Sequence, residues 1–371
     1  MQNFQPGGYV KQGYYKAFIP SAVNREWTIN DMRIVNLLSR ADRLLGKLDM
    51  YSNYVDIELY IRMHIVKEAT QSSRIEGTQT SIEDAFVAKE DIDPQKREDW
   101  DEVQNYIAAM NESVLSLERL PFSSRLIKKT HKTLLQGVRG KHKSPGEYRV
   151  SQNWIGGATI NDARFVPPPH AEIGSLMSDL EKFANNDSLN LPNLLKIALI
   201  HYQFETIHPF LDGNGRVGRL MITLYLIDKG DLKRPILYLS DFFEKHRDLY
   251  YDNLMSVRTR GDIAQWFSFF LTGVIETAEK GIKTFDDILR LKNEIDELFK
   301  NFGKRMSDAK KVTDTLYSQP IVDANAITQI IGKSRVTAHK LLNDLVKLGV
   351  INQLNAGGKR KYYFAKYLAL F

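Results

Sequence analysis

Residues 208–219 read HPFLDGNGRVGR, and this short stretch decides how the rest of the chain is interpreted. Apolar residues recur at helical spacing in the segment before it, LPNLLKIALIHYQFETI (residues 191–207). The same spacing is found in the segment that follows, RVGRLMITLYLIDKG (residues 216–230). The stretch is therefore predicted to be a loop between two helices, and it is rich in glycine, arginine and other polar residues.

One alternative for the loop is a dinucleotide-binding turn, because GNGRVG (residues 213–218) matches the pattern G-x-G-x-x-G. That turn requires a strand before the glycines and an acidic residue about 20 positions further on. Here a helical pattern precedes the glycines and the acidic residue is missing, so this alternative is rejected. A zinc site is rejected too, because His201 and His208 do not form H-E-x-x-H. His201 is interpreted as a packed structural residue.

The residues of the loop instead indicate a site for phosphate. Gly213 and Gly215 allow the backbone to approach a ligand closely, and their N–H groups come just before a helix, where the helix dipole favours an anion. Arg216 and Arg219 are three residues apart, so they project from the same helical face. Guanidinium groups suit phosphate because they bind it through paired hydrogen bonds.

Two further residues of the loop fit phosphate chemistry. Asp212 has the wrong charge for phosphate, but it suits Mg²⁺, which proteins hold through one or two carboxylates plus phosphate oxygens. His208 carries the side chain of a general base toward an incoming hydroxyl group. Together these residues predict a phosphotransfer site that binds a polyphosphate with Mg²⁺.

The complete stretch resembles the defining motif of the Fic family, HPFx[DE]GNGRxxR, and matches it at every fixed position. GEYR at residues 146–149 and the segment around Gly156 resemble the flap of that family. The resemblance implies a mainly α fold: a Fic helical core with a β-hairpin flap, an N-terminal helical region and a C-terminal winged helix. It also implies an enzyme, a protein adenylyltransferase. Such an enzyme transfers AMP from ATP to a Ser, Thr or Tyr hydroxyl of a target protein, or of itself, and releases pyrophosphate.

The resemblance also implies a role for individual residues. His208 would be the catalytic base, Asp212 would hold Mg²⁺, and Asn214 with the loop amides would hold the phosphates. The target protein would add a strand at the hairpin around Gly156. Relatives with lysine at the position of Gly215 act as kinases, so this glycine favours adenylylation. The implied cofactors are ATP and Mg²⁺, and the implied ATP-binding residues are Asp212, Gly213, Asn214, Gly215, Arg216, Arg219 and Tyr251.

A second motif lies upstream, where SSRIEG (residues 72–77) resembles the inhibitory pattern [ST]xxxE[GN] of many Fic proteins. The corresponding helix is predicted over about residues 56–77. Ser72 and Glu76 are four residues apart and share one helical face, and Gly77 is able to end the helix. The resemblance implies that Glu76 pairs with Arg219 and takes the guanidinium that the γ-phosphate needs. ATP would then bind with its α-phosphate misaligned for attack.

The composition is that of a globular protein, with 43% hydrophobic and 26% charged residues. The chain contains no cysteine, which excludes disulfides and thiolate metal sites. No apolar run approaches the ~18 residues of a membrane span, and the first residues lack a signal-peptide pattern. We therefore expect a cytoplasmic protein that does not enter a membrane.

Three regions are predicted: an N-terminal helical region (residues 1–118), the catalytic core (119–302) and a winged-helix domain (303–371). From Lys304 onward there are 12 Lys and Arg against 4 Asp and Glu, a net charge of +8, so the remainder of the chain carries −2. Residues 326–351 have the pattern of a helix–turn–helix, and NAGGKRK (355–361) that of the wing tip. Such a module binds DNA or another protein, and its charge does not decide between them.

Two other functions stay open at this stage. In some relatives the same glutamate positions water and the site removes AMP from its targets, so the sequence does not decide the direction of AMP transfer. The second is a DNA-binding regulator whose Fic core senses ATP. The sequence also does not decide whether the chain forms a homo-oligomer, which protein is the target, or which signal displaces Glu76.

Overall fold

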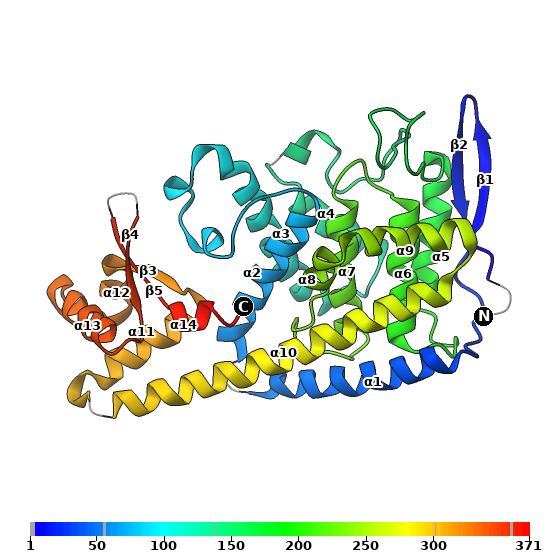
Figure 1. Ribbon diagram of the computed structural model, residues 1–371. Helices are drawn as coiled ribbons and strands as arrows, with labels where there is room; N and C mark the ends of the chain where they lie inside the picture. The colour runs from blue at the N-terminus through cyan, green and yellow to red at the C-terminus, as the bar shows by residue number, and fades with distance from the viewer. Residues whose placement is uncertain (1–3, 55–56, 138, 301, 357–358) are drawn as a thin grey trace.

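The computed structural model describes residues 4–54, 57–137, 139–300, 302–356 and 359–371, and it is mainly helical (Figure 1). The prediction of a mainly α fold is confirmed. No helix among the described residues has both the length and the apolar character that a membrane crossing requires. The α-helices are α1 (Met32–Asp49), α2 (Ile57–Ile75), α3 (Arg97–Leu117), α4 (Ser124–Leu134), α5 (Ile173–Ala184), α6 (Asn193–Ile207), α7 (Asn214–Asp228), α8 (Ser240–Lys245), α9 (Arg247–Arg260), α10 (Ile263–Phe299), α11 (Met306–Ser318), α12 (Ala324–Ile331), α13 (Arg335–Lys347) and α14 (Ala365–Leu368). The strands are β1 (Gly7–Gln12), β2 (Tyr15–Pro20), β3 (Ile321–Asp323), β4 (Asn352–Ala356) and β5 (Lys359–Tyr363).

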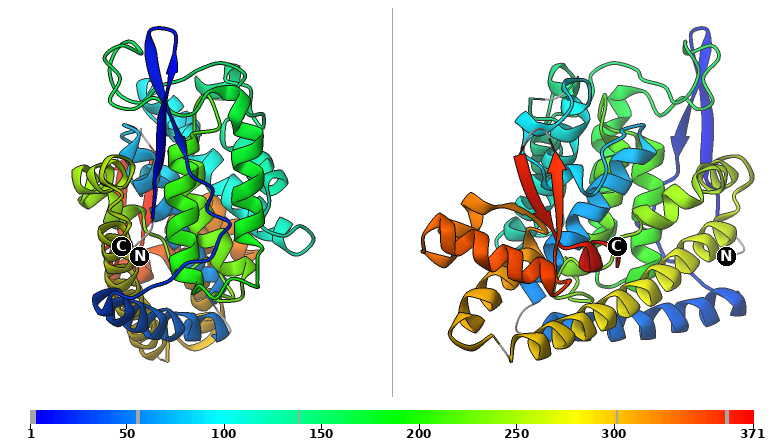
Figure 2. Two further views of the ribbon diagram at one scale, coloured as in Figure 1. Left: turned by 90° about the vertical axis from the view of Figure 1, so that its right-hand side faces the viewer. Right: turned by 60° about the vertical axis from the view of Figure 1, so that its left-hand side comes forward.

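Helices α6 and α7 occupy the centre of the molecule, surrounded by the other helices (Figures 1 and 2). Every side chain of α6 after Asn193 is buried, as expected for a helix that is apolar around most of its circumference. The indole of Trp266 on α10 donates to the Ala198 carbonyl at 2.8 Å, which fixes α6 against that helix. A side chain in place of Gly218 would collide with Glu205, so this glycine allows α6 and α7 to pack closely.

The long helix α10 runs along one side of the molecule, and α1 lies beside it (Figures 1 and 2). In the second half of α10, from Phe285 to Phe299, the buried residues recur three or four positions apart, which is the pattern of a helix with one face against a core. Helix α10 begins within the core and ends next to the C-terminal region, so it connects the two.

The prediction that residues 1–118 are helical is wrong for the first part of this region. Strands β1 and β2 form an antiparallel hairpin, and Gly13 in its turn has a φ of +58°. Aromatic and β-branched residues flank this glycine, and they prefer extended backbone. The N–H of Phe18 donates to the Val166 carbonyl at 3.0 Å, so this hairpin rests on the last part of the predicted flap.

The flap is less regular than the predicted hairpin. Within residues 146–169, all of which the structure describes, Ile155 and Phe165 form one isolated antiparallel bridge and no named strand. Gly156 and Gly157 take φ of +70° and +75°, values that turn the chain away from an extended course directly after the bridge. The carboxylate of Asp162 then accepts from the N–H groups of two loop residues and holds a local turn.

The C-terminal region contains α11, α12 and α13 followed by the antiparallel strands β4 and β5. Strand β3 pairs with the other edge of β5, so the sheet order is β3-β5-β4. Gly332 ends α12 with φ of +63°, and Ser334 caps α13. The predicted helix–turn–helix and hairpin are thus present, while residues 357–358 of the wing tip lie outside the described residues. The winged-helix assignment and the three domain boundaries stay predictions.

Candidate active site

The loop HPFLDGNGRVGR joins α6 to α7 and is held in shape by its own side chains. Helix α6 ends at Ile207, and His208 takes a left-handed φ of 49°, which is uncommon outside glycine. Oδ1 of Asn214 accepts from the Phe210 N–H at 2.9 Å, and Nδ2 donates to the Phe210 carbonyl at 2.9 Å. The Asn214 side chain therefore closes the loop, and its predicted contact with phosphate stays a prediction.

His131 of α4 supports this loop from below. Its ring stacks on Phe210 with 3.7 Å between centroids and 7° between planes. Nδ1 accepts from the Gly146 N–H at 2.8 Å, so the proton lies on Nε2, which donates to the Asp212 carbonyl at 2.9 Å. Burial lowers the pKa of His131 to about 4, which keeps this arrangement neutral. Sequence reasoning missed His131, because one histidine on an amphipathic helix carries no distinctive pattern.

Arg149 joins the flap to the catalytic loop. Its side chain is almost fully buried and donates to the carbonyls of Ser151 (3.0 Å), Pro168 (2.6 Å) and His208 (3.0 Å). Its backbone N–H donates to the Pro209 carbonyl at 2.9 Å. These bonds fix the backbone on both sides of the flap and at the first residue of the motif. The sequence contained this residue in GEYR but did not reveal its role.

One cavity of about 440 Å³ lies beside the loop, within the roughly 300–1,000 Å³ typical of ligand sites. It brings together side chains from the end of α2, the flap, the catalytic loop, α7 and α9. Arg258 and Trp154, which sequence reasoning had not singled out, line it as well. The predicted site residues in its wall are Glu76, Gly156, His208, Gly215, Arg219 and Tyr251.

Arg219 is held by the end of α2. Nη2 donates to Oε1 of Glu76 at 2.7 Å and to the Ser72 carbonyl at 2.9 Å, while Nε donates to Oγ of Ser72 at 2.9 Å. Gly77 follows with φ of +106° and ends this helical segment as predicted. Desolvation opposes ionisation of Glu76, but the positive charge of the adjacent Arg219 outweighs this effect and lowers the pKa of the carboxyl group. The carboxylate and the guanidinium are therefore both charged at neutral pH.

His208 is a neutral imidazole in this environment. Burial and the nearby charges of Arg258 and Arg149 lower its pKa to about 3. Nδ1 is sealed from solvent without a hydrogen-bond partner among the described residues, 4.0 Å from the Glu205 carboxyl group. The ring therefore reaches the cavity through Nε2. Burial also raises the pKa of Glu205 to about 7, with Arg219 opposing that rise.

Comparison with family models identifies two matching segments. The model described as Fic/DOC family N-terminal matches residues 35–115, and the model described as Fic/DOC family matches residues 121–226. Together these segments make up half of the chain, and they include the loop, Glu76 and Arg219. The chain belongs to the Fic/DOC family.

Curated proteins and solved structures agree with this assignment. The Fic chain is 27% identical over 274 residues to a protein named "Protein adenylyltransferase Fic" from Aedes aegypti, covering 69% of this chain and 51% of that protein. A protein of the same name from Drosophila grimshawi is 27% identical over 281 residues, which covers 64% of this chain and 56% of that protein. The chain thus spans about half the length of these curated relatives.

The fold is shared with solved Fic structures. A Fic family protein from Desulfovibrio desulfuricans superimposes with a TM-score of 0.57 at 20% identity, covering 92% of this chain and 98% of that one. A Fic domain containing signaling protein from Bacteroides thetaiotaomicron gives a TM-score of 0.54 at 19% identity, over 68% of this chain and 96% of that one. At these identities the likeness concerns the fold alone.

The remaining predicted residues of the Fic motif lie beside the cavity. Arg216 is buried, with Nη1 3.0 Å from Oε2 of Glu102 and Nη2 3.6 Å from Oδ1 of Asp212. The Asp212 side chain is 42% exposed, and its Oδ1 also accepts from the Gly213 N–H. The described residues contain no group of three or more His, Asp or Glu that would enclose a metal ion. A single, accessible carboxylate fits Mg²⁺ that is held mainly by phosphate oxygens.

Proposed function

We propose that this Fic protein is a protein adenylyltransferase that transfers AMP from ATP to a side-chain hydroxyl of a target protein. The observation that carries the proposal is one cavity whose wall contains both the imidazole of His208 and the guanidinium of Arg219 on α7. A base and a phosphate-binding cation in the wall of one ligand-sized cavity suit attack on a phosphate. The curated relatives bear the name of this activity, which supports the same assignment.

The reaction follows from the positions of these residues. The target hydroxyl oxygen forms a bond to the α-phosphorus of ATP, the bond between that phosphorus and the oxygen bridging to the β-phosphate breaks, and pyrophosphate leaves. The hydroxyl proton passes to Nε2 of His208, whose imidazole is uncharged at neutral pH. The nearby charges of Arg149 and Arg258 make this imidazole a weak base. The negative charge of the bound triphosphate raises its basicity when substrate is present.

The arginines and the loop position the nucleotide. Arg219 binds the γ-phosphate, and the amides of Gly213 and Gly215 at the start of α7 face the phosphate chain. Arg216 contributes positive charge from its place beside Asp212. Asp212 would hold Mg²⁺, which would neutralise part of the phosphate charge. Tyr251 lines the cavity and flanks the adenine.

We further propose that Glu76 inhibits the transfer in the resting protein. Its carboxylate accepts from Nη2 of Arg219, and Ser72 accepts from Nε and from the same Nη2 through two more bonds. A γ-phosphate needs that guanidinium, so ATP binds with its phosphate chain displaced. The rate of transfer falls steeply when the phosphorus lies about 1 Å from the position that suits attack.

Labelled ATP tests the proposed function directly. The protein is incubated with Mg²⁺ and ATP that carries the label either on the α-phosphate or on the γ-phosphate, with a lysate as a source of targets. Adenylyl transfer places only the α-label on protein. Transfer of the γ-label would assign a kinase instead, and no transfer of either label by a variant without Glu76 would contradict the proposal.

Removal of AMP is a second candidate, favoured by the ionised Glu76 carboxylate in the cavity wall. A carboxylate in that place is able to orient water toward a bound phosphate ester. An AMP-modified substrate distinguishes the two directions. If Glu76→Gly abolishes AMP release, the glutamate serves hydrolysis, and if it raises labelling, the glutamate serves inhibition.

The C-terminal region is proposed to contact protein in preference to DNA. Two of its lysines are already paired: Lys333 with Asp308, and Lys361 with Asp91 at 2.8 Å. These pairs reduce the positive charge that is available to the phosphates of DNA. Contacts with these phosphates dominate the affinity of proteins for DNA. A gel shift with the full chain at low salt tests this, and a salt-dependent shift would restore the DNA-binding alternative.

A further inference from the structure

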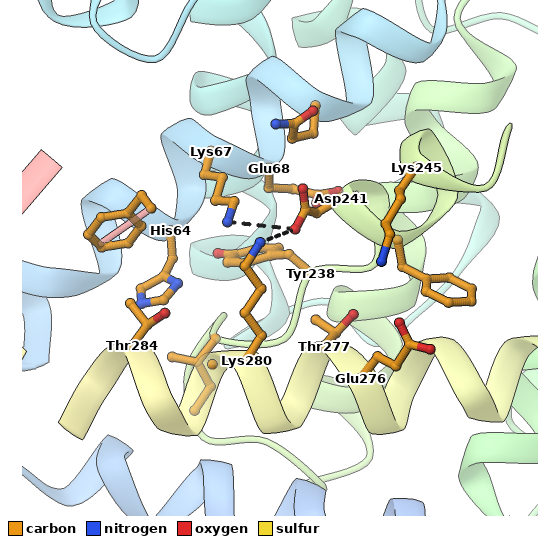
Figure 3. A pocket seen from close by; sticks show the side chains of 15 residues that line it. His64, Lys67, Glu68, Tyr238, Asp241, Lys245, Glu276, Thr277, Lys280 and Thr284 are labelled. Atoms are coloured by element: carbon orange, nitrogen blue, oxygen red, sulfur yellow. Dashed lines mark hydrogen bonds and ion pairs between the residues drawn. The ribbon is translucent and has the colours of Figure 1, made fainter. Parts of the chain in front are cut away.

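A cavity of about 140 Å³ between α2, α8 and α10 contains lysine side chains without an excess of positive charge (Figure 3). Lys67 and Lys280 both approach Oδ2 of Asp241, at 3.7 Å and 2.6 Å. The charged residues of its lining are three carboxylates and three amines: Glu68, Asp241, Glu276, Lys67, Lys245 and Lys280. Positive and negative groups are equal in number, so this cavity selects no ligand by charge.

The outer face of α4 has a different charge distribution. Residues 119–146 contain eight lysines and arginines and no aspartate or glutamate, although residues 1–303 carry a net charge of −2. A surface cavity of about 540 Å³ on α4 has one carboxylate, Glu147, and four cations in its lining, namely Arg125, Lys128, Lys129 and Lys132. These cations are spaced i, i+3, i+4 and i+7, so they lie on one side of the helix. We call these four residues the basic face of α4.

Most of the charge on the basic face is not neutralised within the part of the chain that the structure describes. Lys128 pairs with Glu147 at 2.9 Å. Lys129 donates to an uncharged hydroxyl of α3 at 2.8 Å. Arg125 and Lys132 are exposed, and neither has a carboxylate partner among the described residues. The basic face therefore offers charge to a partner from outside the chain.

Two other carboxylates contact α4 without lining this cavity. Glu112 of α3 accepts from the Thr133 hydroxyl at 2.8 Å, and Glu181 of α5 accepts from the Ser124 N–H at 3.1 Å. Each is thus engaged by a polar group of α4, and neither offsets the charge inside the cavity.

The inner face of the same helix supports the catalytic loop. His131 stacks on Phe210 and bonds to the Asp212 carbonyl, and it accepts from the N–H of Gly146, where the flap begins. A helix with its side chains is about 10–12 Å across, so a partner on the basic face lies about that far from the loop. A protein bound there is close enough to present a neighbouring hydroxyl to the active site.

We propose that the basic face of α4 binds an acidic segment of the target protein, an inference that rests on the proposed function. Arg125 and Lys132 are separated by about 10 Å along the helix axis. An extended segment of about four residues spans the same distance, at about 3.3 Å per residue. Carboxylates in such a segment reach cations along the whole face.

Two features favour carboxylates over nucleic acid as the ligand. Lysine predominates on the basic face, whereas arginine is the residue best suited to phosphate and to nucleic-acid recognition. The aromatic ring in the cavity lining, Tyr148, has the Lys128 ammonium 4.4 Å from its centroid and the Phe210 ring 5.4 Å from it. These contacts cover the ring, which is then not open for the base stacking that single-stranded nucleic acid uses.

Fluorescence anisotropy on the full chain, without ATP, tests the binding surface. The probe is a labelled oligoglutamate peptide, with a Gly-Ser peptide as the uncharged reference. We expect saturable binding of the oligoglutamate that weakens as salt is added, and that falls about tenfold or more in Arg125→Glu/Lys132→Glu. Arg125→Gln/Lys132→Gln, which removes the two charges without reversing them, should weaken binding by a smaller factor. This second variant keeps the test valid if the introduced glutamates destabilise α4.

The matched control lies in the other basic region of the chain. Arg335→Glu/Lys340→Glu reverses two exposed charges of α13, changes the net charge by the same amount and should bind the peptide as the unmodified chain does. Absence of saturable binding would overturn the proposal, as would equal or greater weakening by this control. Tighter binding of a single-stranded oligonucleotide of equal charge, lost in Arg125→Glu/Lys132→Glu, would assign the basic face to nucleic acid instead.

The labelling assay tests target docking separately. Excess oligoglutamate should lower transfer of the α-label to lysate proteins by Glu76→Gly. It should lose this effect when Arg125→Glu/Lys132→Glu is added, and that variant should itself label the lysate more slowly. Labelling that responds to neither change would overturn docking of targets on α4. If Glu76→Gly labels no protein, the proposed function fails, and the anisotropy result still decides whether the basic face binds acidic peptide.

Discussion

Oε1 of Glu76 lies 2.7 Å from Nη2 of Arg219, and both residues line the cavity that contains His208. The carboxylate follows the last turn of α2 and the guanidinium projects from α7, so the pair joins segments that are far apart in the chain. Arg219 is almost fully buried, and it also donates to the hydroxyl and to the carbonyl of Ser72. For phosphate to bind Nη2 of Arg219, the end of α2 has to release this nitrogen.

The first prediction concerns Glu76. Glu76→Gly removes the charged competitor for Arg219, so labelling of target protein by ATP should rise by about 5–150-fold, the range of typical coupling between two sites. Initial rates of α-label transfer measure the effect. Glu58→Gly, at the first turn of the same helix, removes an exposed carboxylate and should leave the rate unchanged. An equal rate in Glu76→Gly and the unmodified chain would contradict the inhibitory role.

The second prediction concerns His208. In the Glu76→Gly background, His208→Ala removes the proposed base, and the rate of label transfer should fall by about 10²–10⁴-fold. ATP binding should persist, because Arg219 and the loop amides remain. His170→Ala provides the control, since that histidine is exposed and does not line the cavity. A variant without His208 that labels at the original rate would require another base.

The third prediction concerns Arg149. Arg149→Ala leaves the carbonyls of Ser151, Pro168 and His208 without their buried donor, and it should lower the free energy of unfolding by about 2–5 kcal/mol. Denaturant unfolding measures this loss. Arg164→Ala, also in the flap, removes an arginine that is mostly exposed and pairs with Asp252 at 2.6 Å. Its effect should stay below about 1 kcal/mol, so equal losses in the two variants would show that Arg149 does not clamp the loop.

The parts of the site that the sequence predicted are those with a long, fixed spacing. HPFLDGNGRVGR placed His208 and Arg219 on adjoining ends of two helices, and SSRIEG placed Glu76 at the end of a third. The contact between Glu76 and Arg219 came from the family resemblance, since periodicity alone does not bring residues so far apart in the chain together. The structure places them in direct contact.

The residues that the sequence did not reveal act through tertiary contacts. His131 and Arg149 hold the loop through backbone carbonyls and a stacked ring, and such contacts leave no periodic trace in the sequence. The hairpin of residues 7–20 did carry a signal, namely aromatic and β-branched residues on both sides of Gly13. The prediction of a helical region over residues 1–118 did not take these residues into account.

The last prediction concerns the pH dependence of stability through Glu205. Burial raises the pKa of this carboxyl from 4.5 to about 7 in the folded protein, with the unfolded chain near the ordinary value. Between these pH values the folded state binds more protons, so this group's contribution to stability is complete below about pH 4.5 and is lost as the pH rises toward 7.

Glu205→Gln keeps the shape of the side chain and is neutral at every pH. It should therefore stabilise the protein by about 3 kcal/mol above pH 7 and by much less near pH 5, because each unit of pKa shift corresponds to about 1.4 kcal/mol. Unfolding curves at the two pH values measure the difference. Glu297→Gln changes a carboxylate that is 68% exposed and should alter stability by no more than about 0.5 kcal/mol at either pH. If the stabilities of Glu205→Gln and the unmodified chain differ by the same amount at both pH values, Glu205 is already ionised in the folded protein at pH 5. Its negative charge would then lie beside Nδ1 of His208 and would raise the pKa of that imidazole.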